Sequence, residues 1–115
     1  MKLLEKQKLF VRCLGKLIIY ANSKGWEFTQ AEGYIGDSID KPTEDTPHLR
    51  HGAHFNRLGI DLNLFINGDW IRDGSHLAWA DLNVFWESLH PLCRTGYDFK
   101  KRDSNHFSIE HEGVM

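Results

Sequence analysis

The clearest structural pattern in this chain is Gly59-Ile60-Asp61-Leu62-Asn63-Leu64-Phe65-Ile66. Aliphatic residues occupy every second position along it, and successive side chains of a β-strand point to opposite faces. The stretch therefore predicts a strand over 59–66 with one aliphatic face that is buried in a core. Asp61 and Asn63 belong to the other, polar face.

The residues that follow this strand predict a hairpin and then a helix. Asn67-Gly68 is a pair typical of a tight turn between antiparallel strands, so 69–72 is expected to return as the partner strand. Apolar residues then recur at helical spacing over 77–89. This pattern predicts a second helix that stops near Pro91, because proline cannot continue a helix.

The residues that precede the strand predict a helix, a strand and a long loop. Apolar residues at steps of three and four over 2–23 indicate an amphipathic helix, and the alternating segment 26–31 indicates a strand. The stretch 33–57 is rich in glycine, proline and charged residues and reads as an irregular loop. A loop of that length in a small domain is usually functional or disordered.

The C-terminal part adds one more strand. A polar turn over 103–105 leads into a short strand over 106–109, in which Phe107 and Ile109 face the core and His106 faces the other way. The pattern as a whole predicts an α+β fold, in which helices lie on one side of a small antiparallel sheet.

Length and composition limit the function classes. The chain of 115 residues fits one domain, 1–115, and its 41% apolar residues supply a modest core. A net charge of −2 and a pI near 6.4 argue against a protein whose main task is to bind nucleic acid. Cys13 and Cys93 form no C-x-x-C arrangement, so we expect buried free thiols of a protein made in a reducing cytosol.

The N-terminal segment has neither a signal-peptide pattern nor a membrane-span pattern. Charged residues interrupt 2–19, so it lacks the unbroken apolar region of a secretion signal. No segment approaches the roughly 20 apolar residues of a membrane span. We therefore expect a protein that is made in the cytoplasm and does not insert into a membrane.

Three side chains are candidates for a metal site. Asp61 follows His54 by seven residues, and His106 lies on the polar face of a second predicted strand. If both strands share a sheet, one carboxylate and two imidazoles converge on one cleft. Such a set suits zinc and leaves a fourth coordination position for water, whose pKa zinc lowers to about 7. The alternative for Asp61 is an ordinary solvated carboxylate.

A general base is wanted beside such a water, and Asp103 is the candidate. Positions i and i+3 of a straight strand point to opposite faces, so the turn at 103–105 must bring Asp103 into the cleft. The alternative is an aspartate that only stabilises this turn. His51 is the nearest competitor of His54 as a ligand, and His48 also lies close to it; either could instead lie on the surface or orient a ligand. His111 follows His106 by five residues, but the alternation places it on the Phe107 face, away from the cleft.

Two half-motifs resemble a known family. His54-Phe55-Asn56-Arg57-Leu58-Gly59-Ile60-Asp61 resembles the H-x(6)-D half of zinc D-Ala-D-Ala carboxypeptidases and phage L-alanyl-D-glutamate peptidases. Asp103-Ser104-Asn105-His106-Phe107 resembles their D-x-x-H half. The flanking segments 61–65 and 85–92 are similar to the phage members especially. The resemblance covers most of the chain from about residue 26.

The resemblance implies the α+β fold shared with hedgehog signalling domains and lysostaphin-type peptidases. It implies a zinc site of His54, Asp61 and His106, with Asp103 as the base. The implied activity is hydrolysis of a bond in the peptidoglycan stem peptide, of the endopeptidase or carboxypeptidase type. The expected setting is a phage endolysin, a monomer made in the host bacterial cytoplasm that reaches the cell wall after its release.

Three positions depart from the family pattern. Gly52 stands where a serine is usual, and Arg57 stands where the motif has a glycine. Many members carry an arginine that steadies the substrate after a strand-end tyrosine, whereas Tyr34 is followed here by Ile35. The loss of one such donor can lower the rate about a hundredfold or more. Arg50 and Arg57 are candidates to replace it in substrate binding, and solvated surface arginines are the alternative.

Two other function classes stay open. One is a non-catalytic zinc-binding module of the same fold that binds cell-wall peptides, and the missing arginine after Tyr34 favours it. The other is an HNH-type nuclease, suggested by Asn105-His106 and by the seven histidines. No basic stripe accompanies the histidines, which argues against nucleic-acid binding. Assays on isolated cell walls and on plasmid DNA separate the three classes.

Overall fold

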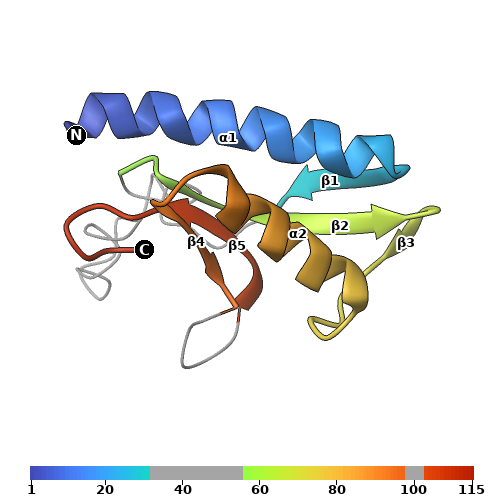
Figure 1. Cartoon of the computed structure of the whole chain (residues 1–115). Helices are drawn as coiled ribbons and strands as arrows, with labels where there is room; N and C mark the ends of the chain where they lie inside the picture. The colour runs from blue at the N-terminus through green and yellow to red at the C-terminus, as the bar shows by residue number, and fades with distance from the viewer. Residues whose placement is uncertain (32–55, 98–102) are drawn as a thin grey trace, which may run out of the picture.

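The computed structural model describes residues 1–31, 56–97 and 103–115. Along the chain, the described elements are α1 (Leu3–Ser23), β1 (Trp26–Gln30), β2 (Gly59–Ile66), β3 (Asp69–Trp70), α2 (Leu77–Leu89), β4 (Cys93–Gly96) and β5 (Asp103–Ile109). All strand pairs are antiparallel, and the sheet has the order β1-β2-β5-β4, with β3 paired to β2. Two helices over a five-stranded antiparallel sheet confirm the α+β class (Figure 1).

Helix α1 covers the length of the sheet (Figure 1). Its buried residues recur at steps of one, three and four, which gives the helix one apolar stripe: Leu9, Phe10, Cys13, Leu17 and Ala21. The helix ends at Ser23, and two residues later Gly25 adopts a φ of 80° that favours glycine. The amides of Lys24 and Gly25 bond to carbonyls of the last turn. The predicted helix over 2–23 is confirmed.

Strand β2 is the centre of the sheet. Its second half pairs with β1, from Gln30 opposite Leu62 to Trp26 opposite Ile66, and its first half pairs with β5. Leu62 and Leu64 are buried, as the aliphatic alternation predicted. Because β2 links both halves of the sheet, its polar face lies next to the polar face of β5.

The core lies between the helices and the aliphatic face of the sheet. Trp86 of α2 is fully buried and meets Phe10 of α1 and Phe107 of β5 edge-on, at centroid distances of 5.9 and 5.7 Å. Its indole N–H donates to the backbone oxygen of Ser108, at 3.0 Å. These contacts tie both helices to one face of the sheet, as predicted, and leave the other face to the polar residues.

Three elements differ from the sequence predictions. Strand β3 ends at Trp70 rather than near residue 72, although the amide of Ile71 still bonds to the oxygen of Leu64. Strand β4 was not predicted at all. Strand β5 begins at Asp103 and includes the segment expected to be a turn. The predicted loop over 33–57 lies outside the described residues except for Asn56 and Arg57.

Two smaller expectations can also be compared with the structure. Cys13 and Cys93 are both buried and free, and their sulfur atoms lie 3.9 Å apart. Neither of the two described helices combines the length and the apolar character that crossing a membrane requires.

Candidate metal centre

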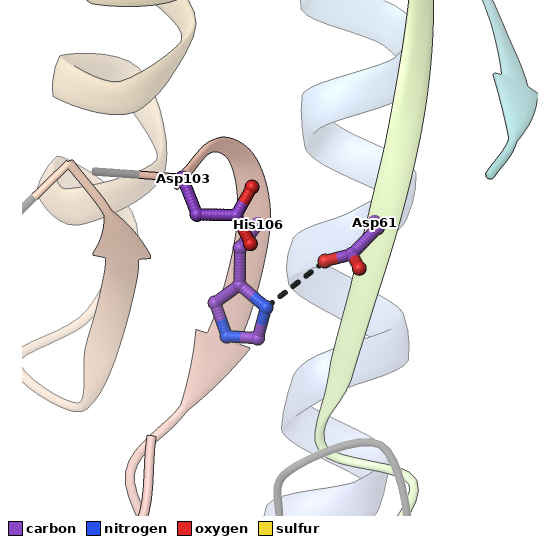
Figure 2. A group of neighbouring side chains, drawn as sticks. All are labelled: Asp61, Asp103 and His106. Atoms are coloured by element: carbon purple, nitrogen blue, oxygen red, sulfur yellow. Dashed lines mark hydrogen bonds and ion pairs between the residues drawn. The ribbon is translucent and has the colours of Figure 1, made fainter. Parts of the chain in front are cut away.

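Strands β2 and β5 bring together three side chains of types that can bind a metal ion. Asp61 lies directly opposite His106 in the antiparallel ladder, and the Nδ1 atom of His106 is 3.0 Å from Oδ1 of Asp61. A carboxylate oxygen of Asp103 completes a group whose potential ligand atoms all lie within 4.8 Å of one another. Figure 2 shows the three side chains grouped on one side of the two strands, with α1 behind β2.

An irregularity in β5 explains how Asp103 and His106 share this face. Thr95 pairs with Phe107, but the next residue of β4, Gly96, pairs with Asp103. The segment 104–106 therefore has no counterpart on β4, and the strand bends there as at a β-bulge. This bulge brings Asp103 and His106 to the same face of β5, as expected. The predicted turn over 103–105 is wrong, because pairing with Gly96 extends β5 to Asp103.

Hydrogen bonds to α2 and to the segment that precedes it hold the start of β5. The hydroxyl of Ser104 donates to the backbone oxygen of Gly74, at 2.9 Å. The buried side-chain amide of Asn83, on α2, donates to the backbone oxygen of Ser104, at 3.0 Å. Asp103 thus precedes a residue whose backbone and side chain both form hydrogen bonds, which fixes the backbone on one side of Asp103.

The second ring nitrogen of His106 shows which atom is available for a metal. Nε2 lies 2.9 Å from the backbone oxygen of Met115, which can only accept a hydrogen bond. In the neutral ring the hydrogen is then on Nε2, and the lone pair of Nδ1 points at the carboxylate of Asp61. A cation placed between Nδ1 and Oδ1 would bind to both acceptors. Ligating histidines typically donate their other N–H to a backbone oxygen in this way.

A tight turn brings Met115 back to His106. His111 and Val114 exchange two backbone hydrogen bonds, each 2.9 Å long. The residues between them, Glu112 and Gly113, both have positive φ angles, 50° and 80°, as in a type I′ turn. The turn reverses the chain just beyond β5, so that the oxygen of Met115 also accepts from the hydroxyl of Ser108 at 3.2 Å.

The donor atoms fit a divalent cation. Ligand bonds of about 2.0–2.1 Å in a tetrahedral zinc site space the donor atoms by about 3.3 Å. The 3.0 Å separation between Asp61 Oδ1 and His106 Nδ1 is close to that spacing. His106 is buried and the two aspartates are half-buried, so an ion there would be partly shielded from water. Two carboxylates and one imidazole could therefore hold a metal ion.

The structure brings together part of the predicted site. Asp61, His106 and Asp103 form one group, as expected. His54 and Arg50 lie outside the described residues, as do His48 and His51. Arg57 is exposed in the turn before β2, with a φ of 59°. His111 contacts Lys6 of α1, with 3.0 Å between Nδ1 and Nζ.

The sequence alone does not indicate one contributor to the site. The backbone oxygen of Met115 orients the ring of His106, and nothing in the residue type of Met115 indicates such a role. The only sequence signal was Gly113, because glycine near a strand end often marks a tight turn.

The comparisons with known proteins assign no family to the chain. No protein-family model matches it, and no curated protein matches it either. The two half-motifs and the geometry of the candidate metal centre are therefore what bears on its function.

Proposed function

We propose that this chain is a zinc peptidase that hydrolyses a peptide bond in the stem peptide of peptidoglycan. The observation that carries the proposal is the pairing of His106 Nδ1 with Asp61 Oδ1 at 3.0 Å, with the Asp103 carboxylate beside them. The resemblance of the two half-motifs to zinc D-Ala-D-Ala carboxypeptidases and phage L-alanyl-D-glutamate peptidases supplies the substrate class. The same resemblance supports a hedgehog-like version of the α+β fold.

In this proposal the ligands are Asp61, His106 and His54. Two imidazoles and one carboxylate suit zinc, and three protein ligands leave a position open. A bound zinc ion supplies Lewis acidity and an acidic water molecule at neutral pH. The contact of His106 Nε2 with Met115 holds the ring so that Nδ1 stays directed at the site.

Asp103 acts as the general base. Its carboxylate accepts a proton from the attacking water, whose oxygen forms a bond to the carbonyl carbon of the substrate. The C–N bond then breaks, and the proton on Asp103 passes to the leaving amine. The products are one carboxylate and one amine. Arg50 and Arg57 are the proposed substrate-binding cations in place of the arginine missing after Tyr34.

Metal content and wall hydrolysis of matched variants test these roles. Asp61→Asn, His106→Ala and His54→Ala should lose bound zinc and activity together. Asp103→Asn should keep one equivalent of zinc and lose about 10²–10⁴-fold in rate, the usual contribution of a general base. Asp69→Asn, which changes an aspartate of the exposed strand β3, is the control and should keep both.

The outcomes separate the assigned roles. If Asp103→Asn keeps full activity, the general-base role is wrong, and if it loses zinc, Asp103 is a ligand instead. A wild-type protein that binds one equivalent of zinc but releases no fragments from any cell wall would be the non-catalytic binding module. Ile35 after Tyr34 is the sequence observation that favours this second function.

In its cellular setting the proposed enzyme is a monomeric phage endolysin. It would be made in the host cytoplasm and would reach the cell wall after the membrane is opened. Mass analysis of the fragments released from a defined wall preparation identifies which bond is cut.

A further inference from the structure

A pocket of about 510 Å³ lies next to the candidate metal centre. It opens between the connection from β3 to α2 and the start of β5, and its lining includes Trp70, Arg72, Gly74, Trp79, Asp103 and Asn105. Its volume falls within the range of about 300–1,000 Å³ that is typical of small-ligand sites. Asp103 belongs both to this pocket and to the metal-binding group, so a molecule in the pocket would touch the proposed base.

The walls of the pocket are held by hydrogen bonds. The carboxylate of Asp73 accepts from the amide and the hydroxyl of Ser75, at 2.9 and 2.7 Å, and these bonds lower the pKa of Asp73. The indole N–H of Trp79 donates to the backbone oxygen of Ile71, at 3.3 Å. The bond from Ser104 to Gly74 joins the two sides. The pocket is therefore formed before any ligand enters.

Arg72 gives the pocket a positive charge. Its guanidinium group lies over the ring of Trp70, 4.7 Å from the ring centroid, a cation–π contact that keeps the donor fork in place. Among the residues that the structure describes, no carboxylate forms an ion pair with it. The pocket thus has a cation from Arg72 and an anion from Asp103, and these opposite charges would orient a polar ligand.

We propose that this pocket binds the residue on the leaving-amine side of the scissile bond, and that Arg72 pairs with a carboxylate of that residue. The inference rests on the proposed peptidase function. Because Asp103 returns its proton to the leaving amine, that nitrogen must lie against Asp103. The residue that carries the nitrogen then extends into the cavity that Asp103 lines. Arg72 can hold its carboxylate through two parallel hydrogen bonds, so Arg72 determines specificity for an acidic residue.

Nuclear magnetic resonance of the tryptophan side chains tests this inference without turnover. Zinc-loaded protein labelled with ¹⁵N is titrated with the product-like dipeptide γ-D-glutamyl-L-lysine, in which the α-carboxylate of the glutamate is free; this ligand is called the acid. The second ligand, called the amide, is the same dipeptide with that glutamate carboxylate converted to an amide. The acid should shift the indole signals of Trp70 and Trp79. The signals of Trp26 and Trp86, which do not line the pocket, are internal controls. The acid should bind about tenfold more tightly than the amide, the usual effect of a charged hydrogen bond.

Charge variants identify the group responsible. Arg72→Gln should remove the preference for the acid, and Arg72→Lys should restore part of it. Arg12→Gln, which removes an exposed arginine on α1, is the matched control and should bind like the wild type. In wall hydrolysis, Arg72→Gln should raise KM for walls with free glutamate carboxylates and leave KM for amidated walls unchanged.

The outcomes distinguish the pocket from the proposed function. If the wild type cleaves walls but the acid and the amide bind equally, or only Trp26 and Trp86 respond, the pocket assignment is overturned and the peptidase function stands. If the acid binds at Trp70 and Trp79 with the expected preference but no wall is cleaved, carboxylate binding is supported and the peptidase function is wrong.

Discussion

Replacing Gly96 with alanine tests whether the close approach of β4 to β5 positions Asp103. A Cβ atom added at Gly96 would overlap the backbone oxygen of Asp103, and would lie 2.8 Å from its Cβ and 2.9 Å from its carbonyl carbon. Carbon atoms in contact normally lie about 3.5–4.0 Å apart, so one strand must move by about 1 Å. The obstructing atoms belong mostly to the backbone, so no side-chain rotation can relieve the overlap.

This displacement determines how much stability and how much activity Gly96→Ala should lose. Overpacking costs about 1–3 kcal/mol, and we expect a value near 3 kcal/mol because backbone must shift. For a domain of this size such a loss lowers Tm by about 10 °C. Moving the carboxylate of Asp103 by about 1 Å should also lower the rate of wall hydrolysis about a hundredfold. Thermal unfolding followed by circular dichroism and hydrolysis of the same wall preparation measure the two effects.

Gly15→Ala is the matched control for this experiment. Gly15 lies inside α1 and has no atom within 4 Å of the position of an added Cβ, so the same substitution should stabilise the protein by about 0.5–1 kcal/mol. A Gly96→Ala protein with the Tm and the activity of the wild type would refute the reasoning. A loss of stability with unchanged activity would show that the approach of the strands does not position the proposed base.

Two further predictions concern the core. Burial raises the pKa of the Cys93 thiol to about 12, and the nearby Cys13 is the next cause. Alkylation of Cys93 at pH 8.5 should therefore be about a thousandfold slower in the folded protein than in denaturant, because the thiolate is the reactive form. Mass spectrometry measures the two rates, and equal rates would contradict this prediction. Because this pKa is raised on folding, its contribution to stability is complete below about pH 8.5 and is lost as the pH rises toward 12. Trp86→Phe removes the indole N–H that donates to the backbone oxygen of Ser108, and it should lower the free energy of unfolding by about 1 kcal/mol or more. The urea midpoint should fall accordingly, and an unchanged midpoint would show that this hydrogen bond adds no stability.

Elements with a strong local pattern could be predicted from the sequence. Strand β2 was predicted over 59–66, with the bounds found in the structure, because its aliphatic residues alternate without exception. Helix α2 was predicted over 77–89 because its apolar spacing is regular and Pro91 follows it. In both cases the packing of the folded protein reinforces what the local pattern favours.

Strand β4 and the bulge in β5 depend on contacts between distant residues. Burial does not alternate along Cys93–Gly96, because the adjacent residues Thr95 and Gly96 are both buried. Gly96 has no side chain, so the backbone of Asp103 can come close to it and the two residues pair. Neither feature produces a periodic signal along the chain.

The candidate site could be predicted only in part, for a related reason. Asp61 and His106 were each placed on the polar face of a strand, but only the register of the sheet sets them opposite each other. The approach of Arg72 to the side of the sheet that carries Asp103 comes from the packing of the segment between β3 and α2. Met115 contributes a backbone atom, and any residue type can supply that.

The core residues of β2 and the candidate metal-binding residue Asp61 lie on opposite faces of the sheet, so the two groups can be substituted independently. Buried Leu62 and Leu64 of β2 point into the core between the sheet and the helices, whereas Asp61 points to the opposite side. Substituting Asp61 therefore removes no side chain of the apolar core. Copies of the chain that lose the candidate metal-binding residue Asp61 should therefore still fold. For the same reason, a library randomised on that side alone would sample new reactivity on an unchanged scaffold.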